Sequence, residues 1–411
     1  MIRDRDVETG SLLPKVRDLA EVLSISPSTV SEAWSLLRQR GLISGRGKSG
    51  TRLVSPAELS SQSTGPAPGV THDLRYVLPD PELLPPLDQA LLSAAAQPGL
   101  SEYDKTGISL ALEHAVREIW PYRCEALIAA SGAADGLWLA LRALSVPGDR
   151  VLLESPGSPP IVRIVQNLGL IPVELESDTH GPSPASLLAG IRADPVAFVY
   201  QPRAQVPTGR VTSRKRIAEL AGIVERSRCM AIEFDDIGDL SLVKDRSIGE
   251  HVPERTILVK SFEKAYGPDL RMSVIGGSAH LVTGIHGDMR LERQWTSRIL
   301  QGALSWLLTD QQTQEGLHAT RVVYRRRLRD LCSAMAAVGI PVEAKEGMCV
   351  WLPVEHEDAA VASAAADGVL VYPGRYSFPD ARGGFVRIAT SRLQGDVDRV
   401  AEVLRTATRA S

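Results

Sequence analysis

The amino-acid sequence predicts an α/β protein in which a small winged helix-turn-helix precedes a larger domain with a mostly parallel sheet. Three observations support this prediction. Basic side chains outnumber acidic ones in the first 56 residues, whereas the rest of the chain is acidic. Two helical stretches joined by a short turn lie in that basic segment. From residue 73 onward, helical stretches separate five apolar runs without alternation, at 126–130, 151–153, 196–200, 230–232 and 256–259. Such runs are typical of strands buried on both faces.

Composition places the chain among ordinary globular proteins. It has 411 residues, 44% of them apolar and 23% charged, which is enough for two or three domains and excludes a disordered or fibrous protein. The longest apolar runs fall well short of the ~18 residues of a membrane span. The four cysteines lie far apart without metal-ligand spacing. We therefore expect a cytoplasmic protein with no membrane partner, no metal site and no disulfide framework.

The charge distribution predicts a division into domains. Residues 1–56 carry nine basic and six acidic side chains, so the remaining chain holds the acidic excess behind the overall net charge of -3. A small basic module in front of an acidic one suggests a nucleic-acid reader. Residues 55–69 are rich in Ser, Pro and Gly and almost uncharged, as in a linker. We predict a DNA-binding domain at 1–56, a linker at 57–72 and a large domain at 73–411.

The basic module has the pattern of a helix-turn-helix. An apolar stripe predicts a first helix over 15–23, and Ser26 and Pro27 can cap and open a second helix. The second helix repeats apolar residues at Val30, Ala33, Trp34 and Leu37. We expect Ser28 and Thr29, at its exposed start, to reach base edges in a major groove.

A wing follows the second helix. Two short strands between residues 42 and 54 flank a Gly-rich basic loop, which would lay Arg46 and Lys48 along DNA phosphates. A solvated hairpin tip is the alternative for these two side chains, because many helix pairs joined by a tight turn never contact DNA.

Residues with binding chemistry follow the apolar runs of the large domain, where ligands gather in a parallel sheet. The run at 126–130 leads into small residues, 131–136, that open a helix able to hold a phosphate. The run at 196–200 leads into a rigid polar turn, 201–209. Carboxylates follow the run at 230–232, and the run at 256–259 leads to Lys260, Ser261, Lys264 and Arg271. A phosphate turn, a strand-end acid and a strand-end lysine together meet the requirements of pyridoxal 5′-phosphate.

Three segments of the basic module, Leu13–Ala20 (LPKVRDLA), Ser26–Val30 (SPSTV) and the turn ending in Gly50-Thr51, resemble the winged-helix domain of GntR-type bacterial regulators. The resemblance implies that Arg17 contacts operator DNA. The family has a full helix before this motif, whereas the stretch ahead of Leu12 is short and charged. Either the start is truncated or the first helix is provided differently.

The order of the pieces in residues 73–411 resembles fold-type I aminotransferases. The resemblance implies that Lys264 is the Schiff-base lysine and that Arg271, in a KxxxPxLR pattern, binds the cofactor phosphate with Ser261 and the backbone of Ala133 and Ala134. It also implies a smaller C-terminal subdomain, in which Arg387 binds the substrate carboxylate; a structural arginine on a strand is the alternative. Lys260 is the rival lysine, but it lacks the spaced PxLR.

Two positions depart from the aminotransferase pattern. The first Asp expected at the pyridine-nitrogen site is replaced by Phe234, so that Asp235 either serves as the ring partner or replaces it by a one-residue shift. Ser158 stands where an aromatic residue would stack on the ring. We expect cofactor binding to survive these losses more readily than turnover does.

A GntR-like winged helix joined to an aminotransferase-like domain resembles the MocR/GabR regulators over nearly the whole chain. That resemblance implies a homodimeric regulator that binds pyridoxal 5′-phosphate, an amino-acid-like effector and double-stranded operator DNA. The alternative is a working aminotransferase with a vestigial N-terminal module. The missing first helix favours the enzyme, whereas Phe234 and Ser158 favour the regulator, which we therefore prefer.

Overall fold

The computed structural model describes residues 12–39, 43–44, 51–53, 69–103, 106–292 and 295–410. The chain divides into two compact units, Met1–Pro68 and Gly69–Ser411. The division falls inside the predicted linker at 57–72. Among the described residues, no helix combines the length and the apolar character that crossing a bilayer requires.

The described residues of the first unit form two helices and a three-stranded antiparallel sheet of strand order β1-β3-β2. Its elements are β1 (Leu12–Leu13), α1 (Val16–Leu23), α2 (Pro27–Gln39), β2 (Ile43–Ser44) and β3 (Thr51–Leu53). The Ser26 hydroxyl accepts a hydrogen bond from the backbone N–H of Thr29 at 3.1 Å, so Ser26 caps α2 as predicted. The sequence did not reveal β1, which pairs with β3.

A small apolar core joins the two helices to the sheet. Ala20, Val30, Trp34 and Ile43 are buried in it. The helix predicted over 15–23 is confirmed as Val16–Leu23, and two residues of its apolar stripe, Val22 and Leu23, are 79% and 53% exposed. Leu23 is the last residue of the helix.

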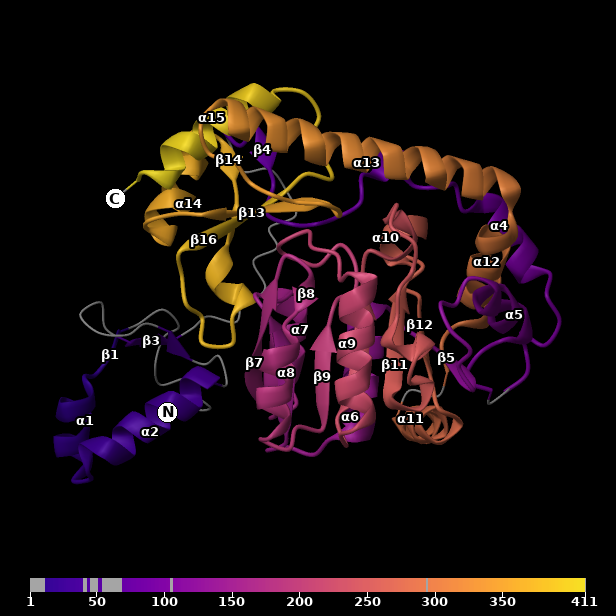
Figure 1. The fold of residues 1–411 in the computed structure, drawn as a ribbon, viewed down its shortest axis with the longest axis horizontal. Coiled ribbons are helices and arrows are strands. Elements are labelled where there is room, and N and C mark those ends of the chain that lie inside the picture. The colour runs from indigo at the N-terminus through magenta and orange to yellow at the C-terminus, as the bar shows by residue number, and fades with distance from the viewer. Residues whose placement is uncertain are drawn as a thin grey trace. The chain divides into compact units, whose positions relative to one another are not determined.

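The second unit is built on an eight-stranded sheet, which confirms the predicted α/β class (Figure 1). In spatial order its strands are β5 (Ala126–Ala130), β12 (Ser273–Gly277), β11 (Thr256–Ser261), β10 (Met230–Asp235), β9 (Ala197–Tyr200), β6 (Arg150–Ser155), β7 (Ile171–Asp178) and β8 (Gly181–Pro182). All five apolar runs form strands. The pairings among β11, β10, β9, β6 and β7 are parallel, and β12 and β8 pair antiparallel with their neighbours.

Helices cover both faces of this sheet, which explains the apolar runs without alternation. One face packs against α6 (Ala133–Leu144), α7 (Pro159–Asn167) and α11 (Ala279–Glu292). On the other face lie α8 (Pro184–Ile191) and α9 (Arg214–Glu225), and beside them α4 (Asp88–Ala95), α5 (Leu110–Glu118) and α12 (Arg298–Thr309). Each strand therefore contributes alternate residues to two apolar layers.

A smaller C-terminal part of the second unit has its own sheet and core. The long helix α13 (Gln311–Ala337) runs from α12 to this part (Figure 1). The three-stranded sheet of this part has the strand order β13 (Cys349–Pro353), β16 (Phe385–Ala389), β15 (Tyr372–Pro373). The helices α14 (Glu357–Ala366) and α15 (Val397–Thr408) pack on its core. A short strand, β4 (His72–Asp73), pairs with β14 (Val369–Leu370), so the chain enters the second unit through this part.

Candidate functional site

The predicted cofactor residues meet at one edge of the large sheet. Strand β12 runs between β5 and β11, and its first residue, Ser273, lies opposite Ala130 on one side and Ser261 on the other. The turn that opens α6 and the segment that carries Lys264 are thereby held next to each other. The strand β12 was not predicted from the sequence, because its short run contains two glycines.

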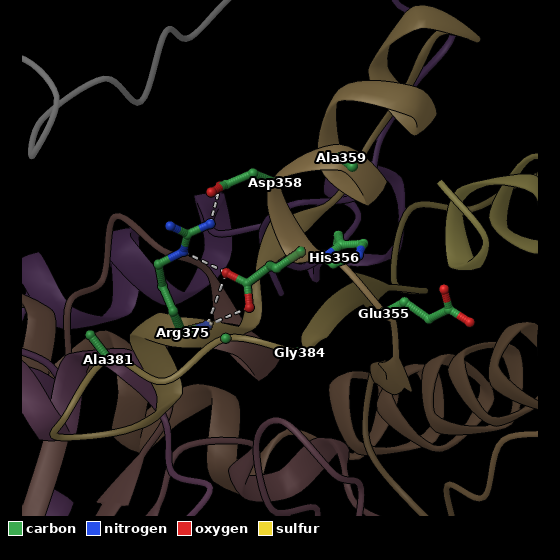
Figure 2. Close-up of a pocket in the computed structure, with 9 residues that line it drawn as sticks. Glu355, His356, Asp358, Ala359, Arg375, Ala381 and Gly384 are labelled. Carbon is green, nitrogen blue, oxygen red and sulfur yellow. Dashed lines mark hydrogen bonds and ion pairs between the residues drawn. The ribbon is translucent and has the colours of Figure 1, made fainter. Parts of the chain in front are cut away.

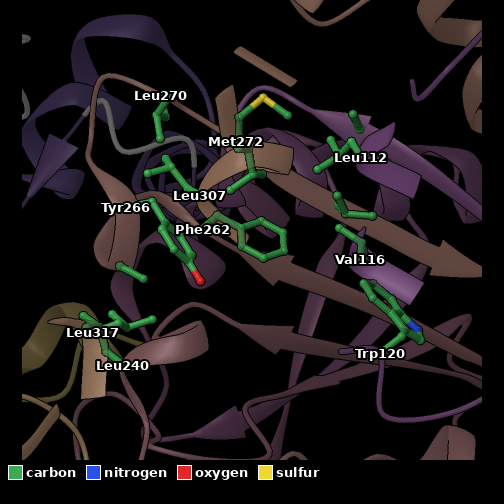
Figure 3. Close-up of a cluster of buried hydrophobic side chains, with 14 of the residues drawn as sticks. Leu112, Val116, Trp120, Leu240, Phe262, Tyr266, Leu270, Met272, Leu307 and Leu317 are labelled. Atoms are coloured by element: carbon green, nitrogen blue, oxygen red, sulfur yellow. The ribbon is translucent and has the colours of Figure 1, made fainter. Parts of the chain in front are cut away.

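A buried apolar cluster anchors the segment around Lys264. Phe262, Tyr266, Leu270 and Met272 are buried in this cluster (Figure 3). Lys264 lies between these anchors on the short helix α10 (Glu263–Tyr266). The packing fixes the backbone on both sides of the lysine, and the amine remains partly exposed at the site.

Lys264 has a carboxylate partner that the sequence did not suggest. Its Nζ lies 2.6 Å from Oδ1 of Asp236, and both side chains keep some contact with water. Asp236 follows the last residue of β10 and shares a face with Phe234, because successive residues of a strand point to opposite sides.

The rival lysine, Lys260, is held in a buried network of charges. Its Nζ lies 2.9 Å from Asp239 Oδ1 and 3.0 Å from Asp245 Oδ2, and the residue is completely buried. Burial alone would lower the pKa of Lys260, but these carboxylates outweigh it and raise the pKa. A lysine that stays protonated and enclosed is a poor nucleophile, so the geometry favours Lys264 for cofactor attachment.

Asp235 belongs to the same network. The guanidinium of Arg203 donates to both of its carboxylate oxygens, at 3.1 and 2.7 Å. Burial by itself would raise the pKa of Asp235, but Arg203 and Lys260 lower it and keep the carboxylate charged. Asp235 thus points to the face opposite Phe234, which is buried in the apolar layer under α6. Its role as ring partner remains a prediction.

The predicted phosphate turn has the geometry of an anion site. The backbone N–H of Ala133 donates to Glu263 Oε2 at 3.1 Å, and Arg271 Nε lies 3.9 Å from Glu263 Oε1. Gly132 has φ 96°, a backbone conformation that favours glycine, and a Cβ there would come within 2.7 Å of this carboxylate. Arg271 itself has a left-handed backbone (φ 45°), which is uncommon for a residue with a side chain.

Two further predicted phosphate ligands border this turn. Ser261 is buried, and its hydroxyl accepts a weak hydrogen bond from the N–H of Glu263 at 3.4 Å. Ala134 is exposed in the first turn of α6. Ser273, which the sequence analysis missed, donates its hydroxyl to the carbonyl of Gly132 at 2.8 Å and so fixes the turn from below.

Arg387 lies on β16 of the small sheet and is 5% exposed. One Nη donates to the carbonyl of Arg75 at 2.8 Å, and the guanidinium lies 4.3 Å from the centre of the Tyr372 ring. Its Nε has no hydrogen-bond partner, and no ion pair is found for it among the described residues. Burial lowers the pKa of Arg387, although Cys349 and Asp236 oppose this shift. An arginine so placed fits a ligand carboxylate.

The polar turn at 201–209 contacts both Pro156, which follows a strand of the large sheet, and Cys349 on the small sheet. Gln205 donates to the carbonyl of Pro156 at 2.6 Å and accepts from the N–H of Thr208 at 3.1 Å. The thiol of Cys349, on the small sheet, lies 3.4 Å from the carbonyl of Pro207. Ser158, at the position expected for a stacking aromatic, is buried and precedes α7.

The predicted DNA-contacting residues of α1 and α2 are on the surface of the first unit. Arg17, Ser28 and Thr29 are exposed. The hydroxyls of Ser28 and Thr29 lie 2.6 and 2.8 Å from the hydroxyl of Ser26, which caps α2. Both residues therefore lie in the first turn of this helix. Arg46 and Lys48 lie outside the described residues.

A separate hollow of about 540 Å³ lies on the small C-terminal part (Figure 2). Arg375 bridges Glu357 and Asp358 at its wall, as the dashed lines of Figure 2 show. It contains none of the residues predicted from the sequence to bind cofactor or effector, and its arginine, Arg375, already pairs with Glu357 and Asp358.

Comparison with known protein families follows this division of the chain. Residues 78–404 match the aminotransferase class I and II family, and residues 1–53 match the gntR family of bacterial regulatory proteins. The chain therefore belongs to the aminotransferase class I and II family and carries a GntR-type helix-turn-helix at its N-terminus.

Characterised relatives share both parts. The chain is 29% identical to the vitamin B6 salvage pathway transcriptional repressor PtsJ of Salmonella typhimurium, over 93% of this chain and 89% of the relative. It is 25% identical to the HTH-type transcriptional regulator TauR of Rhodobacter capsulatus, over 96% and 92%. These are MocR-type regulators, which confirms the predicted arrangement.

Solved structures confirm the aminotransferase fold. The α-aminoadipate aminotransferase LysN of Thermus thermophilus, complexed with N-(5′-phosphopyridoxyl)-L-leucine, matches with a TM-score of 0.74 at 22% identity, over 83% of this chain and 93% of that one. A multiple substrate aminotransferase of Thermococcus profundus matches with a TM-score of 0.78 at 17% identity, over 86% and 96%.

This fold supports pyridoxal 5′-phosphate as the cofactor, as expected, and the residues present fit it. An accessible amine at Lys264 and a glycine-lined anion site beside Arg271 lie at one sheet edge. Phe234 replaces the first Asp of the expected acidic pattern, and Asp235, the other candidate for the pyridine nitrogen, is paired with Arg203.

Proposed function

We propose that this protein is a DNA-binding transcriptional regulator whose aminotransferase-like unit senses an amino-acid-like effector in the presence of pyridoxal 5′-phosphate. The observation that carries the effector assignment is Arg387, a buried guanidinium with an unbonded Nε and no carboxylate partner among the described residues. A ligand carboxylate would satisfy it with two parallel hydrogen bonds.

In this proposal Lys264 attaches the cofactor, and Ala133, Ala134, Ser261 and Arg271 hold its phosphate. The cofactor, when bound, supplies an electrophilic carbon that can react with an amino group. Asp236 holds the Lys264 amine in place as an ion pair. Phe234 places no carboxylate at the first Asp of the pattern, so the bound cofactor would give less support to proton removal from an amino acid, and the complex would be long-lived. A long-lived complex suits a sensor.

The first unit would read duplex DNA. Arg17 and the wing residues Arg46 and Lys48 would bind phosphates, and Ser28 and Thr29 would lie near base edges. A regulator of this kind works where the chromosome is, in the cytoplasm.

We also propose that the chain forms a homodimer. Large apolar side chains are exposed on α4, on α5, at the end of α11 and in the segment between α4 and α5: Leu92 66%, Tyr103 79%, Leu110 86% and Leu291 88%. These elements lie on the same side of the second unit (Figure 1). Apolar groups exposed to this extent are typical of surfaces that another subunit covers.

The test compares wild type, Arg387→Ala and Arg387→Lys, with Arg399→Ala as a control for an exposed arginine on α15. Absorbance titration with amino acids reports effector binding, and fluorescence anisotropy with genomic fragments selected by the wild type reports DNA binding. Both Arg387 variants should lose the spectral response to amino acids and the effect of amino acids on DNA binding. Arg399→Ala should retain both. An intact response in Arg387→Ala would contradict the assignment.

A product assay decides between the regulator and the alternative aminotransferase. Rapid multi-turnover transamination by the wild type would favour the enzyme.

A further inference from the structure

Glu263 is the residue that the site chemistry does not yet explain. It directly precedes Lys264, and its carboxylate lies at the opening of α6. Oε2 accepts the backbone N–H of Ala133 at 3.1 Å, and Oε1 lies 3.9 Å from Nε of Arg271. Two of the groups assigned to the cofactor phosphate, the N–H of Ala133 and the guanidinium of Arg271, therefore already contact a carboxylate of the chain itself.

The turn is shaped to accept this carboxylate. Gly132 has φ 96°, and a Cβ there would lie 2.7 Å from Oε1 of Glu263 and 3.0 Å from its Cδ. The site lies at the N-terminus of the 12-residue helix α6, where free N–H groups and the helix dipole favour an anion. The same features would hold a phosphate, so the two anions need the same space and the same donors.

We propose that Glu263 is an internal occupant of the phosphate site, which must leave before the phosphate of the cofactor can bind. The proposal rests on the proposed function, since it takes this site as the one that holds pyridoxal 5′-phosphate. A carboxylate left within a few ångströms of a dianionic phosphate repels it, because like charges interact strongly where water is partly excluded. Glu263 must therefore rotate away and give up its contacts with Ala133 and Arg271.

The consequence is selective weakening of phosphorylated ligands. Displacement of Glu263 opposes binding of the phosphate but not of the pyridine ring or the aldehyde. Occupancy of the site by the cofactor then depends on the concentration of the phosphorylated cofactor, because the Glu263 carboxylate already binds these donors when no cofactor is present. Glu263 is in this sense a specificity-determining residue.

The test uses the full-length apoprotein and two ligands, pyridoxal 5′-phosphate and pyridoxal, which lacks the phosphate. Wild type, Glu263→Ser, Glu263→Gln and the control Glu402→Ser, an exposed glutamate on α15, are titrated by absorbance at equilibrium. Glu263→Ser should bind pyridoxal 5′-phosphate at least about tenfold more tightly, which corresponds to about 1.4 kcal/mol. Its affinity for pyridoxal should change less than about twofold. Glu263→Gln, which keeps the side-chain length, should gain in the same direction, and Glu402→Ser should match the wild type.

Thermal unfolding with inorganic phosphate gives a second readout that does not depend on the cofactor. Phosphate should raise the melting temperature of Glu263→Ser more than that of the wild type, because a ligand stabilises the state that it binds. Equal or weaker binding of pyridoxal 5′-phosphate by both Glu263 variants would overturn the proposal and leave the proposed function standing. An equal gain for both ligands would also overturn it. Failure of every variant to bind either ligand would overturn both.

Discussion

Replacement of Lys260 by methionine tests whether the two lysines have the separate roles that the geometry assigns. Lys260 is fully buried, with Asp239 and Asp245 at 2.9 and 3.0 Å and Asp235 at 3.8 Å. Methionine fills a similar volume but removes the charge, so three carboxylates would then share only Arg203. Removing one partner of a buried ion pair costs about 3–5 kcal/mol of the free energy of unfolding, because the remaining charge is left uncompensated.

The matched control is Lys264→Met. Lys264 and its partner Asp236 are 17% and 15% exposed, whereas Lys260 is fully buried, so loss of the Lys264 ion pair should cost less than loss of Lys260. With an m-value of roughly 3 kcal/mol/M, Lys260→Met should lower the urea midpoint of the second unit by roughly 1 M, and Lys264→Met by less. Circular dichroism during urea titration measures this difference.

Borohydride reduction after loading with pyridoxal 5′-phosphate, followed by peptide mapping, completes the comparison. The label should be on Lys264 in the wild type and in folded Lys260→Met, and absent from Lys264→Met. A label on Lys260, or equal stability of the two variants, would refute the assignment of a structural role to Lys260 and a chemical one to Lys264.

Three further predictions follow from the same structure. Arg17→Ala should weaken binding to all duplex sequences and reduce the slope of log affinity against log salt by about one unit, as for one lost phosphate contact; an unchanged slope in anisotropy titrations would remove Arg17 from the interface. Phe234→Asp should gain transamination product at a cost in stability, whereas Phe234→Leu should gain none; product formation by both, measured by chromatography, would disconnect turnover from the ring acid. Burial raises the pKa of Glu233 to about 7, so the folded state prefers the protonated form and the free energy of unfolding should fall as pH rises from about 4.5 to 7. Glu233→Gln should remove roughly 1–3 kcal/mol of this pH dependence between pH 5 and 8. If urea titrations gave both proteins the same change in unfolding free energy with pH, Glu233 would be ionised throughout this range.

Local signals in the sequence were sufficient for five strands of the large sheet, for the helix-turn-helix and for the choice of candidate residues. Five uninterrupted apolar runs predicted five strands, because a strand buried on both faces needs apolar side chains on both. Ser26 and Pro27 predicted the start of α2, since a hydroxyl cap and a proline suit those backbone positions. The strand β12 was missed because Ser273 and its two glycines give a weak apolar signal, although this strand brings the phosphate turn next to the Lys264 segment.

The sequence by itself determined which chemical groups stand near the strand ends, and the tertiary structure decided which of them are available. Lys260 and Lys264 are four residues apart and alike in type, but only the fold encloses one of them with carboxylates. Asp235 forms an ion pair with Arg203, 32 residues away, and the N–H of Ala133 donates a hydrogen bond to Glu263, 130 residues away. The physical reason is that the charge and reactivity of a side chain depend on its burial and its partners, and partners so distant along the chain become neighbours only when the sheet has formed.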